Sequence, residues 1–227
     1  MKIDKIKVFP TEVKAGVTLR NLEEYQPLGF SISETAYINK ADVNSFRNLL
    51  AETLSVEPGK MKFQKQIHGD IIRYVDENSE IEESDGMITD KPGIVLNISI
   101  ADCCAILIYD TKQKIIAAIH SGWRGTQKNI SFKAVKKLVD EFNSDTADII
   151  CYLSACASGE NYEVEEDVAQ FFPSSIKAIP GDKFLFDNKK EIREQLLSAG
   201  VQDENIVVSD VCTISDENYH SYRRDKE

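Results

Sequence analysis

Apolar side chains recur every three or four positions in three parts of the chain, and this spacing predicts an amphipathic helix in each. The predicted helices cover residues 40–55, about 126–142 and 188–200. At the start of the third helix, Asn188 and Glu191 have the spacing of a capping box. Gly200 stands where this helix is expected to end in a C-terminal cap.

Apolar, β-branched runs predict strands in the remaining parts of the chain. These runs cover residues 61–67, 71–75, 94–100, 105–109, 115–120, 149–153 and 206–211. The first two flank the turn His68-Gly69-Asp70, which predicts a hairpin. The three runs between residues 94 and 120 are almost continuously apolar, as expected for central strands that are covered on both faces. Residues 82–90 are polar and rich in turn formers, and we expect a loop there.

The mixture of elements predicts an α/β or α+β protein in which helices cover a mixed sheet. Residues 1–227 contain no Gly/Ser-rich or Pro-rich linker and no internal repeat, so we expect a single domain. The sequence does not reveal the order of the strands within the sheet.

Composition narrows the class of protein. Of 227 residues, 27 are Lys or Arg and 38 are Asp or Glu, which gives a net charge of −11 and a pI near 4.9. Such an acidic chain is a poor candidate for holding nucleic acid or an anionic membrane through bulk charge. A local cationic site for a small anion remains compatible with it. No run approaches the length of apolar sequence that a membrane span needs.

The cysteines indicate a reducing compartment. Five are present, an odd number without the regular spacing of a disulfide framework: Cys103, Cys104, Cys151, Cys156 and Cys212. Residues 1–7 are charged and precede no apolar signal segment. We therefore expect a cytoplasmic protein, in which a cysteine serves as a core residue, a nucleophile or a metal ligand.

Two of the three histidines stand where predicted strands end. His68 follows the 61–67 run, His120 ends the 115–120 run, and Cys103 interrupts two apolar runs between them. Because strand ends gather at one edge of a sheet, these side chains are candidates for a common site. Two imidazoles and a thiolate are suitable ligands for a catalytic zinc ion with one open position, and copper accepts the same donors.

The same residues have two other interpretations. A histidine at a strand end is commonly a hydrogen-bonded structural residue, and Cys103 with Cys104 suits a buried apolar run. A site without metal is also consistent with the residues, with Cys103 as nucleophile, His120 as its base, and Asp102 or another group orienting the imidazole. The local spacing matches no compact zinc motif, so the residues alone leave these interpretations open.

The Gly-rich segment 121–125 is a candidate anion site. Gly122 and Gly125 permit a tight turn, and Arg124 stands at the expected start of a helix. Free backbone amides and a guanidinium at that place suit a phosphate or a carboxylate. The simpler interpretation is a capping turn with an exposed arginine. Trp123 suits either a core position or stacking on an aromatic ligand.

Several ordered motifs resemble the laccase-domain family, also called the polyphenol-oxidase-annotated or YfiH type. The four main motifs are Gln66-Ile67-His68-Gly69, Ser84-Asp85-Gly86, Ala101-Asp102-Cys103-Cys104 and His120-Ser121-Gly122-Trp123-Arg124-Gly125. Two later motifs of the family are similar to Tyr162-Glu163-Val164 and Ser221-Tyr222-Arg223-Arg224-Asp225. The resemblance therefore covers about residues 40–225.

This resemblance implies a YfiH-like α/β sandwich with a zinc site built from His68, Cys103 and His120. It implies a purine nucleoside phosphorylase that acts on adenosine, inosine, guanosine and methylthioadenosine, with adenosine deamination as an additional activity. Purine nucleosides and phosphate are the partners of such an enzyme. Zinc in an open site lowers the pKa of its bound water to about 7, which would supply a hydroxide for deamination.

The resemblance also suggests roles for side chains around the metal. Asp102 or Glu163 would move the proton in deamination. Arg124, together with Arg47, would neutralise and orient the phosphate. Tyr162 and Glu163, from the Tyr-Glu-Val motif, would belong to the same substrate site.

The chain departs from the family pattern in three places. Ala105 stands where the family usually has Pro, and residues 153–157 read Leu-Ser-Ala-Cys-Ala where many members have Gly-Pro. The sequence stops at Glu227, where the family normally continues to a Gly-Arg element. None of these differences removes an expected metal ligand, and the last two bear on the substrate pocket.

Three other classes of function are compatible with the sequence. The first is a metal-free cysteine hydrolase that uses Cys103 and His120. The second is a copper-dependent polyphenol oxidase (laccase), although a multicopper cluster needs many histidines and this chain has three. The third is a non-catalytic protein acting in the fidelity of peptidoglycan synthesis. The sequence permits a homodimer, and no feature of it establishes one.

Overall fold

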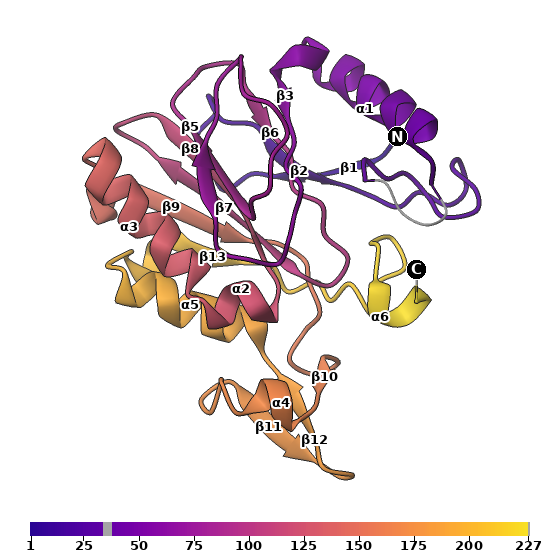
Figure 1. Ribbon diagram of the computed structural model, residues 1–227, viewed down its shortest axis with the longest axis vertical. Helices are drawn as coiled ribbons and strands as arrows, with labels where there is room; N and C mark the ends of the chain where they lie inside the picture. The colour runs from indigo at the N-terminus through magenta and orange to yellow at the C-terminus, as the bar shows by residue number, and fades with distance from the viewer. Residues whose placement is uncertain (34–37, 227) are drawn as a thin grey trace.

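A six-stranded mixed sheet forms the centre of the computed structural model, which describes residues 1–33 and 38–226 (Figure 1). In spatial order its strands are β13 (Ile206–Val208), β9 (Ile149–Leu153), β7 (Cys104–Asp110), β8 (Ile115–Ser121), β5 (Gly86–Thr89) and β4 (Ile72–Tyr74). The pairs at the two edges are parallel, and the three inner pairs are antiparallel. The antiparallel register of β7 and β8 places the start of β7 beside the end of β8.

Helices α3 (Ile130–Phe142) and α5 (Asn188–Ser198) cover one face of this sheet (Figure 1). Their apolar side chains pack on alternate residues of β7 and β8, such as Ile106 and Ile119, which are fully buried. Each large aliphatic side chain buried in this way contributes about 1.5–3 kcal/mol to folding. The short helix α2 (Trp123–Gln127) connects the end of β8 to α3.

The N-terminal part of the chain lies on the other side of the sheet (Figure 1). It contains the hairpin β1 (Ile3–Ile6) and β2 (Ala15–Thr18), helix α1 (Lys40–Leu54), the 3₁₀ turn η1 (Pro58–Lys60), and the parallel pair β3 (Met61–Lys62) and β6 (Val95–Leu96). The rings of Tyr25, Phe30 and Phe46 meet with centroids 5.1–5.4 Å apart. These rings fill the apolar core beneath α1.

A small antiparallel sheet extends from the bottom of the molecule in Figure 1. It consists of β10 (Glu163–Val164), β12 (Lys183–Phe186) and β11 (Ile176–Ile179), in that order, with helix α4 (Glu166–Ala169) beside it. Phe172 and Phe186 stack in its core with centroids 4.3 Å apart. Trp123, on α2, packs against this same core and so joins the small sheet to the main one. The remaining short helices are η2 (Thr146–Asp148), η3 (Asp203–Asn205) and α6 (Tyr222–Asp225).

The structure confirms the predicted fold class and most of the regular elements. The predicted helix at 40–55 is α1, and the runs 105–109, 115–120 and 149–153 are β7, β8 and β9. The run 206–211 contains β13, which ends at Val208. None of the helices in the described residues is both long and apolar enough to cross a lipid bilayer.

The third predicted helix is α5, but its capping differs from the prediction. The side chain of Asp187, rather than that of Asn188, caps the helix by accepting the N–H of Lys190 at 3.0 Å. The carboxylate of Glu191 accepts the hydroxyl of Ser175 instead of turning back to the helix start. Gly200 follows the helix at φ +97°, as its predicted capping role requires.

The predicted hairpin at residues 61–75 is wrong. Strand β3 pairs in parallel with β6, whereas β4 pairs in parallel with β5 in a different sheet. The chain between them turns at His68, whose φ is +56°. A carboxylate far away in the sequence, Asp85, binds the backbone of this turn, and sequence periodicity does not report such a contact.

Three other expectations are also corrected. The run 94–100 is not a central strand, since only the two residues of β6 pair, at half-buried positions. The expected loop at 82–90 contains β5, which is completely buried; a Cβ on Gly86 would lie 2.7 Å from Ile119 Cδ1, so glycine permits this close approach to β8. The predicted helix 126–142 is divided into α2 and α3 at Asn129, which has a φ of +58°.

Candidate functional site

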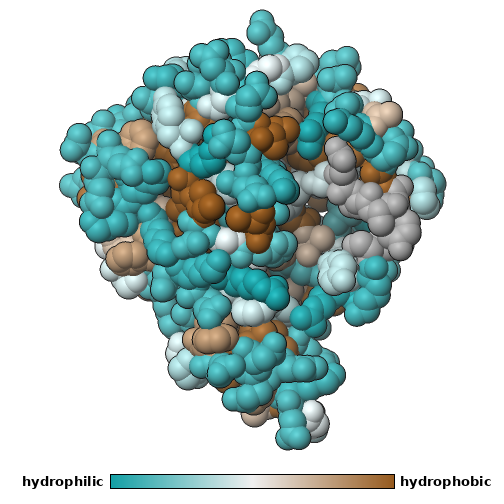
Figure 2. All heavy atoms as spheres, viewed as in Figure 1, coloured by the Kyte–Doolittle hydropathy of each residue, from teal (hydrophilic) through white to brown (hydrophobic). Residues whose placement is uncertain are grey.

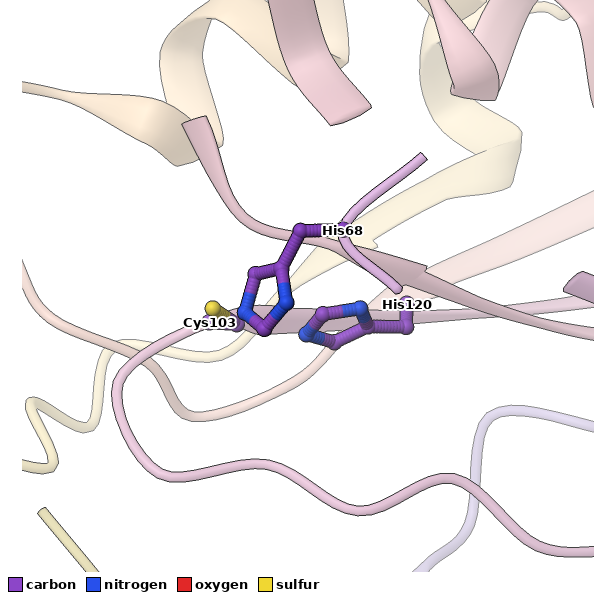
Figure 3. A group of neighbouring side chains, drawn as sticks. All are labelled: His68, Cys103 and His120. Carbon is purple, nitrogen blue, oxygen red and sulfur yellow. The ribbon is translucent and has the colours of Figure 1, made fainter. Parts of the chain in front are cut away.

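His68, Cys103 and His120 come together at one end of β7 and β8 (Figure 3). His120 is in β8, Cys103 immediately precedes β7, and His68 reaches the site from the turn after β3. Their donor atoms all lie within 4.8 Å of one another. The two imidazole rings meet edge to face with centroids 4.8 Å apart. The expected grouping of the three side chains is therefore present in the structure.

Asp85 supports this cluster from beneath and is fully buried. Its Oδ1 lies 2.8 Å from His120 Nδ1 and accepts the backbone N–H of His68 at 3.0 Å. Its Oδ2 accepts the backbone N–H of Gly69 at 2.6 Å. One carboxylate thus orients the His120 ring, leaves its Nε2 for a ligand, and fixes the turn that carries His68.

The sequence interpretation gave Asp85 no role. It stands in the Ser84-Asp85-Gly86 motif, directly before β5, and that motif was its only sequence signal. A fully buried aspartate is rarely unpaired, and Asp85 is buried because it directly precedes the buried strand β5.

The electrostatics of the cluster favour a thiolate. Burial tends to raise the pKa of the Cys103 thiol, but hydrogen bonds with His120 and His68 lower it to about 7. Burial tends to lower the pKa of His120, but Asp85 and Cys103 raise it to about 9. Burial also acts to raise the pKa of Asp85, and the bonds from His120 and Gly69 bring it below its usual value. Cys103 is therefore deprotonated more easily than an ordinary thiol.

Gly122 provides space for the cluster at the turn from β8 into α2. A Cβ at this position would lie 2.7 Å from Cys103 Sγ and 3.4 Å from His68 Cδ2. Its φ of −79° is ordinary, so the reason for glycine here is close approach and not backbone conformation. The Gly-rich segment thus serves the cluster directly, which the sequence did not reveal.

The cluster opens into a cavity of about 1370 Å³. Other residues that line the cavity near the cluster are Asp102, Trp123, Arg124, Tyr162 and Arg223. Figure 2 shows a mostly hydrophilic face on which hydrophobic side chains gather around a hollow right of the centre. Pockets for small ligands commonly measure about 300–1,000 Å³, so this cavity has room for a nucleoside together with an anion.

Asp102 lines the cavity, but its carboxylate is already engaged. Oδ1 accepts the hydroxyl of Thr213 at 2.7 Å, and Oδ2 accepts the backbone N–H of Arg223 at 2.7 Å. The residue has a φ of +84°, which is uncommon for a residue with a side chain. Contacts made by this carboxylate therefore hold an unfavourable backbone conformation beside Cys103.

Arg124 and Tyr162, two other predicted site residues, also lie at the cavity. The guanidinium carbon of Arg124 stands 4.3 Å from the centre of the Trp123 ring. Tyr162 is buried, and burial is the main cause that raises its pKa to about 12, so its hydroxyl stays protonated at neutral pH. The guanidinium of Arg223, a residue that the sequence interpretation left without a role, lies 5.0 Å from the Tyr162 ring centre.

Arg47 and Glu163 do not join the site as expected. Arg47 is in α1, where its Nε donates to the Ile32 carbonyl at 2.9 Å and its guanidinium lies over the Phe63 ring. The Glu163 carboxylate pairs with Lys183 at 2.8 Å on the surface of the small sheet. Neither side chain is among the described residues that line the cavity. The order of residues in a motif did not determine which way each side chain points.

Two departures from the family pattern prove to be linked. The N–H of Ala105 donates to Ser154 Oγ at 2.9 Å, and the Ser154 hydroxyl donates to the Ala155 carbonyl at 2.9 Å. Proline at position 105 has no N–H and could not make the first bond. The segment 153–157 is thus tied to β7 by a hydrogen bond that depends on alanine replacing proline.

Comparison with known proteins places the chain among close relatives. Residues 21–227 match the family model described as "Multi-copper polyphenol oxidoreductase laccase". A purine nucleoside phosphorylase of Corynebacterium glutamicum is 35% identical over 192 residues, which are 81% of this chain and 76% of that protein. A purine nucleoside phosphorylase of Clostridium acetobutylicum is 37% identical over 169 residues, 72% of this chain and 70% of that protein.

Solved structures show the same fold. The crystal structure of YlmD from Geobacillus stearothermophilus superposes with a TM-score of 0.88 and 26% identity, covering 94% of this chain and 87% of that one. The Bacillus licheniformis hypothetical protein YfiH superposes with a TM-score of 0.86 and 24% identity, covering 94% and 88% of the two chains. The mixed sheet with its helical layer is therefore the fold of these proteins.

Proposed function

Because the chain belongs to the family described as multi-copper polyphenol oxidoreductase laccase, the YfiH type, we propose that it is a zinc-dependent purine nucleoside phosphorylase. Relatives that carry the name purine nucleoside phosphorylase support the reaction class. The observation that carries the proposal furthest is the cluster of His68, Cys103 and His120 at the wall of a cavity that also holds Arg124.

The three side chains of the cluster fit a zinc ion. They supply two imidazoles and an easily deprotonated thiol, and Asp85 holds His120 with one ring nitrogen directed away from the carboxylate. Zinc with three protein ligands would supply a Lewis acid and lower the pKa of water at its open position to about 7. Copper suits the same donors, so metal analysis is part of the test below.

Phosphorolysis exchanges one bond at the ribose. A phosphate oxygen bonds to C1′ while the C1′–N9 bond breaks; its electrons leave with the purine, which takes up a proton. The products are ribose 1-phosphate and the free base. Arg124 would bind and orient the phosphate, because a guanidinium can hold an oxyanion through two parallel hydrogen bonds. We propose adenosine, inosine, guanosine and methylthioadenosine as the substrates.

We propose adenosine deamination as an additional reaction in the same cavity. Water adds to C6 of the adenine ring and ammonia leaves, which gives inosine. Of the two carboxylates that the sequence suggests for proton transfer, Asp102 lines the cavity and Glu163 does not. Asp102 already accepts two hydrogen bonds, and Glu163 pairs with Lys183 outside the cavity.

Metal content and product formation, measured on one sample, test this function. Purified protein of known metal content is incubated with adenosine and phosphate. Adenine with ribose 1-phosphate indicates phosphorolysis, and inosine or hypoxanthine indicates deamination. We expect about one zinc ion per chain, and we expect Cys103→Ala to lose both the metal and the products.

A control variant distinguishes loss of the site from loss of the fold. Cys151→Ala removes a thiol that is buried in β9, within the apolar core, so it should keep zinc and both activities. A zinc-loaded wild type that forms no product would contradict the enzymatic proposal. Nucleoside binding without turnover would then favour the non-catalytic alternative.

One observation favours a second candidate function. Asp85, His120 and Cys103 form a line in which a carboxylate orients an imidazole beside a thiol, as in a cysteine hydrolase. Alkylation of Cys103 that zinc prevents would support the metal site. A covalent acyl adduct on Cys103 in metal-free protein would support the hydrolase.

The number of histidines bears on the copper oxidase that the family description names. The cluster contains two histidines, and the third, His220, is engaged elsewhere, with Nε2 2.8 Å from the Phe30 carbonyl. The donor set therefore serves one ion, whereas laccase chemistry relays electrons among several copper ions. Blue absorption and phenol oxidation by copper-loaded protein would support the oxidase.

We further propose a cytoplasmic location, consistent with five free thiols.

A further inference from the structure

Two guanidinium groups lie on two aromatic rings in the lining of the cavity into which the cluster opens. Arg124 stands over Trp123 with 4.3 Å between guanidinium carbon and ring centre, and Arg223 stands over Tyr162 at 5.0 Å. Trp123 and Tyr162 pack in one apolar cluster, so the rings are fixed relative to each other. All four residues line the cavity. A ring beneath a guanidinium fixes its plane and leaves its edge N–H groups available.

Arg223 differs sharply from its neighbour Arg224. The Arg224 guanidinium donates to the carbonyls of Thr213 and Tyr219, each at 2.8 Å, and to the Asp225 carboxylate. These bonds hold the C-terminal segment in place. The Arg223 guanidinium donates from Nη1 to the Glu163 carbonyl at 2.8 Å, and it also interacts with the Tyr162 hydroxyl, which acts to lower the pKa of Tyr162. Its other N–H groups are therefore available to a ligand.

The backbone of Arg223 is fixed to the residue that precedes Cys103. Asp102 Oδ2 accepts the Arg223 N–H at 2.7 Å, and Asp102 Oδ1 accepts the Thr213 hydroxyl. Asp102 thus joins the cluster to the segment that carries Arg223. The Asp102 carboxylate already accepts hydrogen bonds from two donors. Arg124 and Arg223 carry two positive charges against the one negative charge of Asp102, so these three side chains together favour an anion.

We propose that Arg124 and Arg223 form a two-sided clamp for the phosphate oxyanion, and that Asp102 is the positioning residue that holds Arg223 in place. This inference rests on the proposed phosphorolysis, for which it names the second phosphate-binding residue. Arg223 thereby takes the place that the sequence gave to Arg47, whose side chain is not among those that line the cavity. Two arginines can bind a dianion through parallel hydrogen bonds from two directions.

Direct binding of inorganic phosphate tests the clamp. Calorimetric titration of the zinc-loaded protein measures the dissociation constant, and zinc content is measured on each sample. Arg223→Gln should weaken phosphate binding about 10- to 100-fold, because a charge-assisted hydrogen-bond donor is lost. Arg223→Lys should recover part of this loss, since it restores the charge without the planar fork. The affinity for inosine should change less than twofold or so in both variants.

Arg193→Gln is the matched control. Arg193 lies on the exposed side of α5, is paired with Asp203, and does not line the cavity. It should leave phosphate binding unchanged. An equal loss in the Arg193 and Arg223 variants, an unchanged dissociation constant in Arg223→Gln, or a wild type that does not bind phosphate would each overturn the clamp.

The same measurements separate this inference from the proposed function. Phosphate binding that depends on Arg223, in a protein that cleaves no nucleoside, would leave the clamp standing and contradict phosphorolysis. Nucleoside cleavage with an unchanged KM for phosphate in Arg223→Gln would support phosphorolysis and contradict the clamp.

A double-mutant cycle tests the role of Asp102. Asp102→Asn should raise the KM for phosphate about 10-fold, because an amide cannot accept both hydrogen bonds and the Arg223 backbone shifts. In the Arg223→Gln background, the same change should have little further effect on that KM. Additive effects would show that Asp102 acts independently of Arg223 and would overturn its positioning role. If Asp102 had only a structural role, Asp102→Asn would lower stability, and its effect on the KM for phosphate would not depend on the residue at position 223.

Discussion

At the residue scale, the cluster depends on available space as well as on donor type. His68, Cys103 and His120 supply the donors, but Cys103 Sγ lies where a side chain at position 122 would stand. The Asp85 carboxylate adds a second condition, because it binds the His120 ring and the backbone of the His68 turn together. Two residues outside the cluster, Gly122 and Asp85, therefore determine its shape.

Gly122→Ala should reduce zinc affinity by at least about 10-fold, because its Cβ would lie 2.7 Å from Cys103 Sγ and displace this ligand. Competition with a chromophoric chelator measures the affinity. Gly59→Ala is the control, since a Cβ at that position meets no atom within 4 Å. Equal zinc affinity in the two variants would show that the cluster tolerates the methyl group.

Asp85→Asn should weaken zinc binding about 10- to 100-fold, the usual effect of losing a carboxylate that orients a ligating histidine. An amide keeps the size of the side chain but loses the charge and one of the acceptor oxygens. Zinc affinity and thermal stability are measured together. Asp76→Asn, in an exposed turn where the carboxylate also accepts a backbone N–H, should leave zinc affinity unchanged. A similar effect in both variants would argue against the orienting role.

At the element scale, a buried polar network fixes the end of β8 against α5. Asn188, at the start of α5, donates to the Ser121 carbonyl at 3.0 Å and accepts the Thr126 hydroxyl at 2.7 Å. Gln195, two turns further along α5, donates to the Thr126 carbonyl at 2.8 Å. These bonds hold the chain on both sides of Gly122, so α5 supports the cluster without contributing a residue to it.

Asn188→Ala should lower the free energy of unfolding by about 1–3 kcal/mol, because the buried Ser121 carbonyl loses this donor and the Thr126 hydroxyl keeps only the Ser121 hydroxyl as a partner. Urea denaturation measures this loss. Arg193→Gln, at an exposed position of the same helix, should change stability by less than about 0.5 kcal/mol. A loss for Asn188→Ala no larger than that of this control would mean that water or other groups satisfy the network.

At the scale of the whole molecule, the two terminal parts of the chain lie near each other (Figure 1), and a hydrogen bond and an ion pair join them. The Tyr219 hydroxyl donates to Asp4 at 2.8 Å, and Arg20 pairs with Asp225 at 3.3 Å. His220 Nε2 lies 2.8 Å from the Phe30 carbonyl, which identifies this nitrogen as the donor. The segment that carries Arg223 is thus held by the N-terminal part of the chain and by Asp102.

His220 should make stability depend on pH. Burial, followed by the charge of Arg20, lowers its pKa below the ordinary 6.5, while the bond to the Phe30 carbonyl opposes the shift. The unfolded chain therefore takes up a proton at a higher pH than the folded one, and folding loses stability as the pH falls through and below 6.5.

Replacing His220 with Gln removes this titration while keeping an N–H donor for the Phe30 carbonyl. The wild type should therefore lose stability faster than His220→Gln between about pH 7.5 and about pH 5. Urea denaturation across this range measures the difference. Parallel curves for the two proteins would show that His220 does not titrate differently on folding.

Sequence periodicity determined the elements whose contacts are local or simply apolar. It identified α1, α5 and the central strands β7, β8 and β9, because their burial imposes a regular pattern on their own residues. It failed where a partner distant in the sequence decides the conformation. The segment 82–90 reads as a loop although it contains β5, because Asp85 binds His120 and Gly86 allows the close approach of Ile119. The break between α2 and α3 depends on the backbone conformation of one residue, Asn129.

The site shows the same division. The sequence alone determined the donor types His68, Cys103 and His120, since few residue types bind zinc and this chain has few histidines. Only the tertiary structure decided which other side chains face them. It brings Asp85 to the cluster and Arg223 to the cavity, whereas Arg47 and Glu163 do not line that cavity. The reason is physical: a residue's type states which bonds it can form, but the packing of distant segments determines which partner it meets.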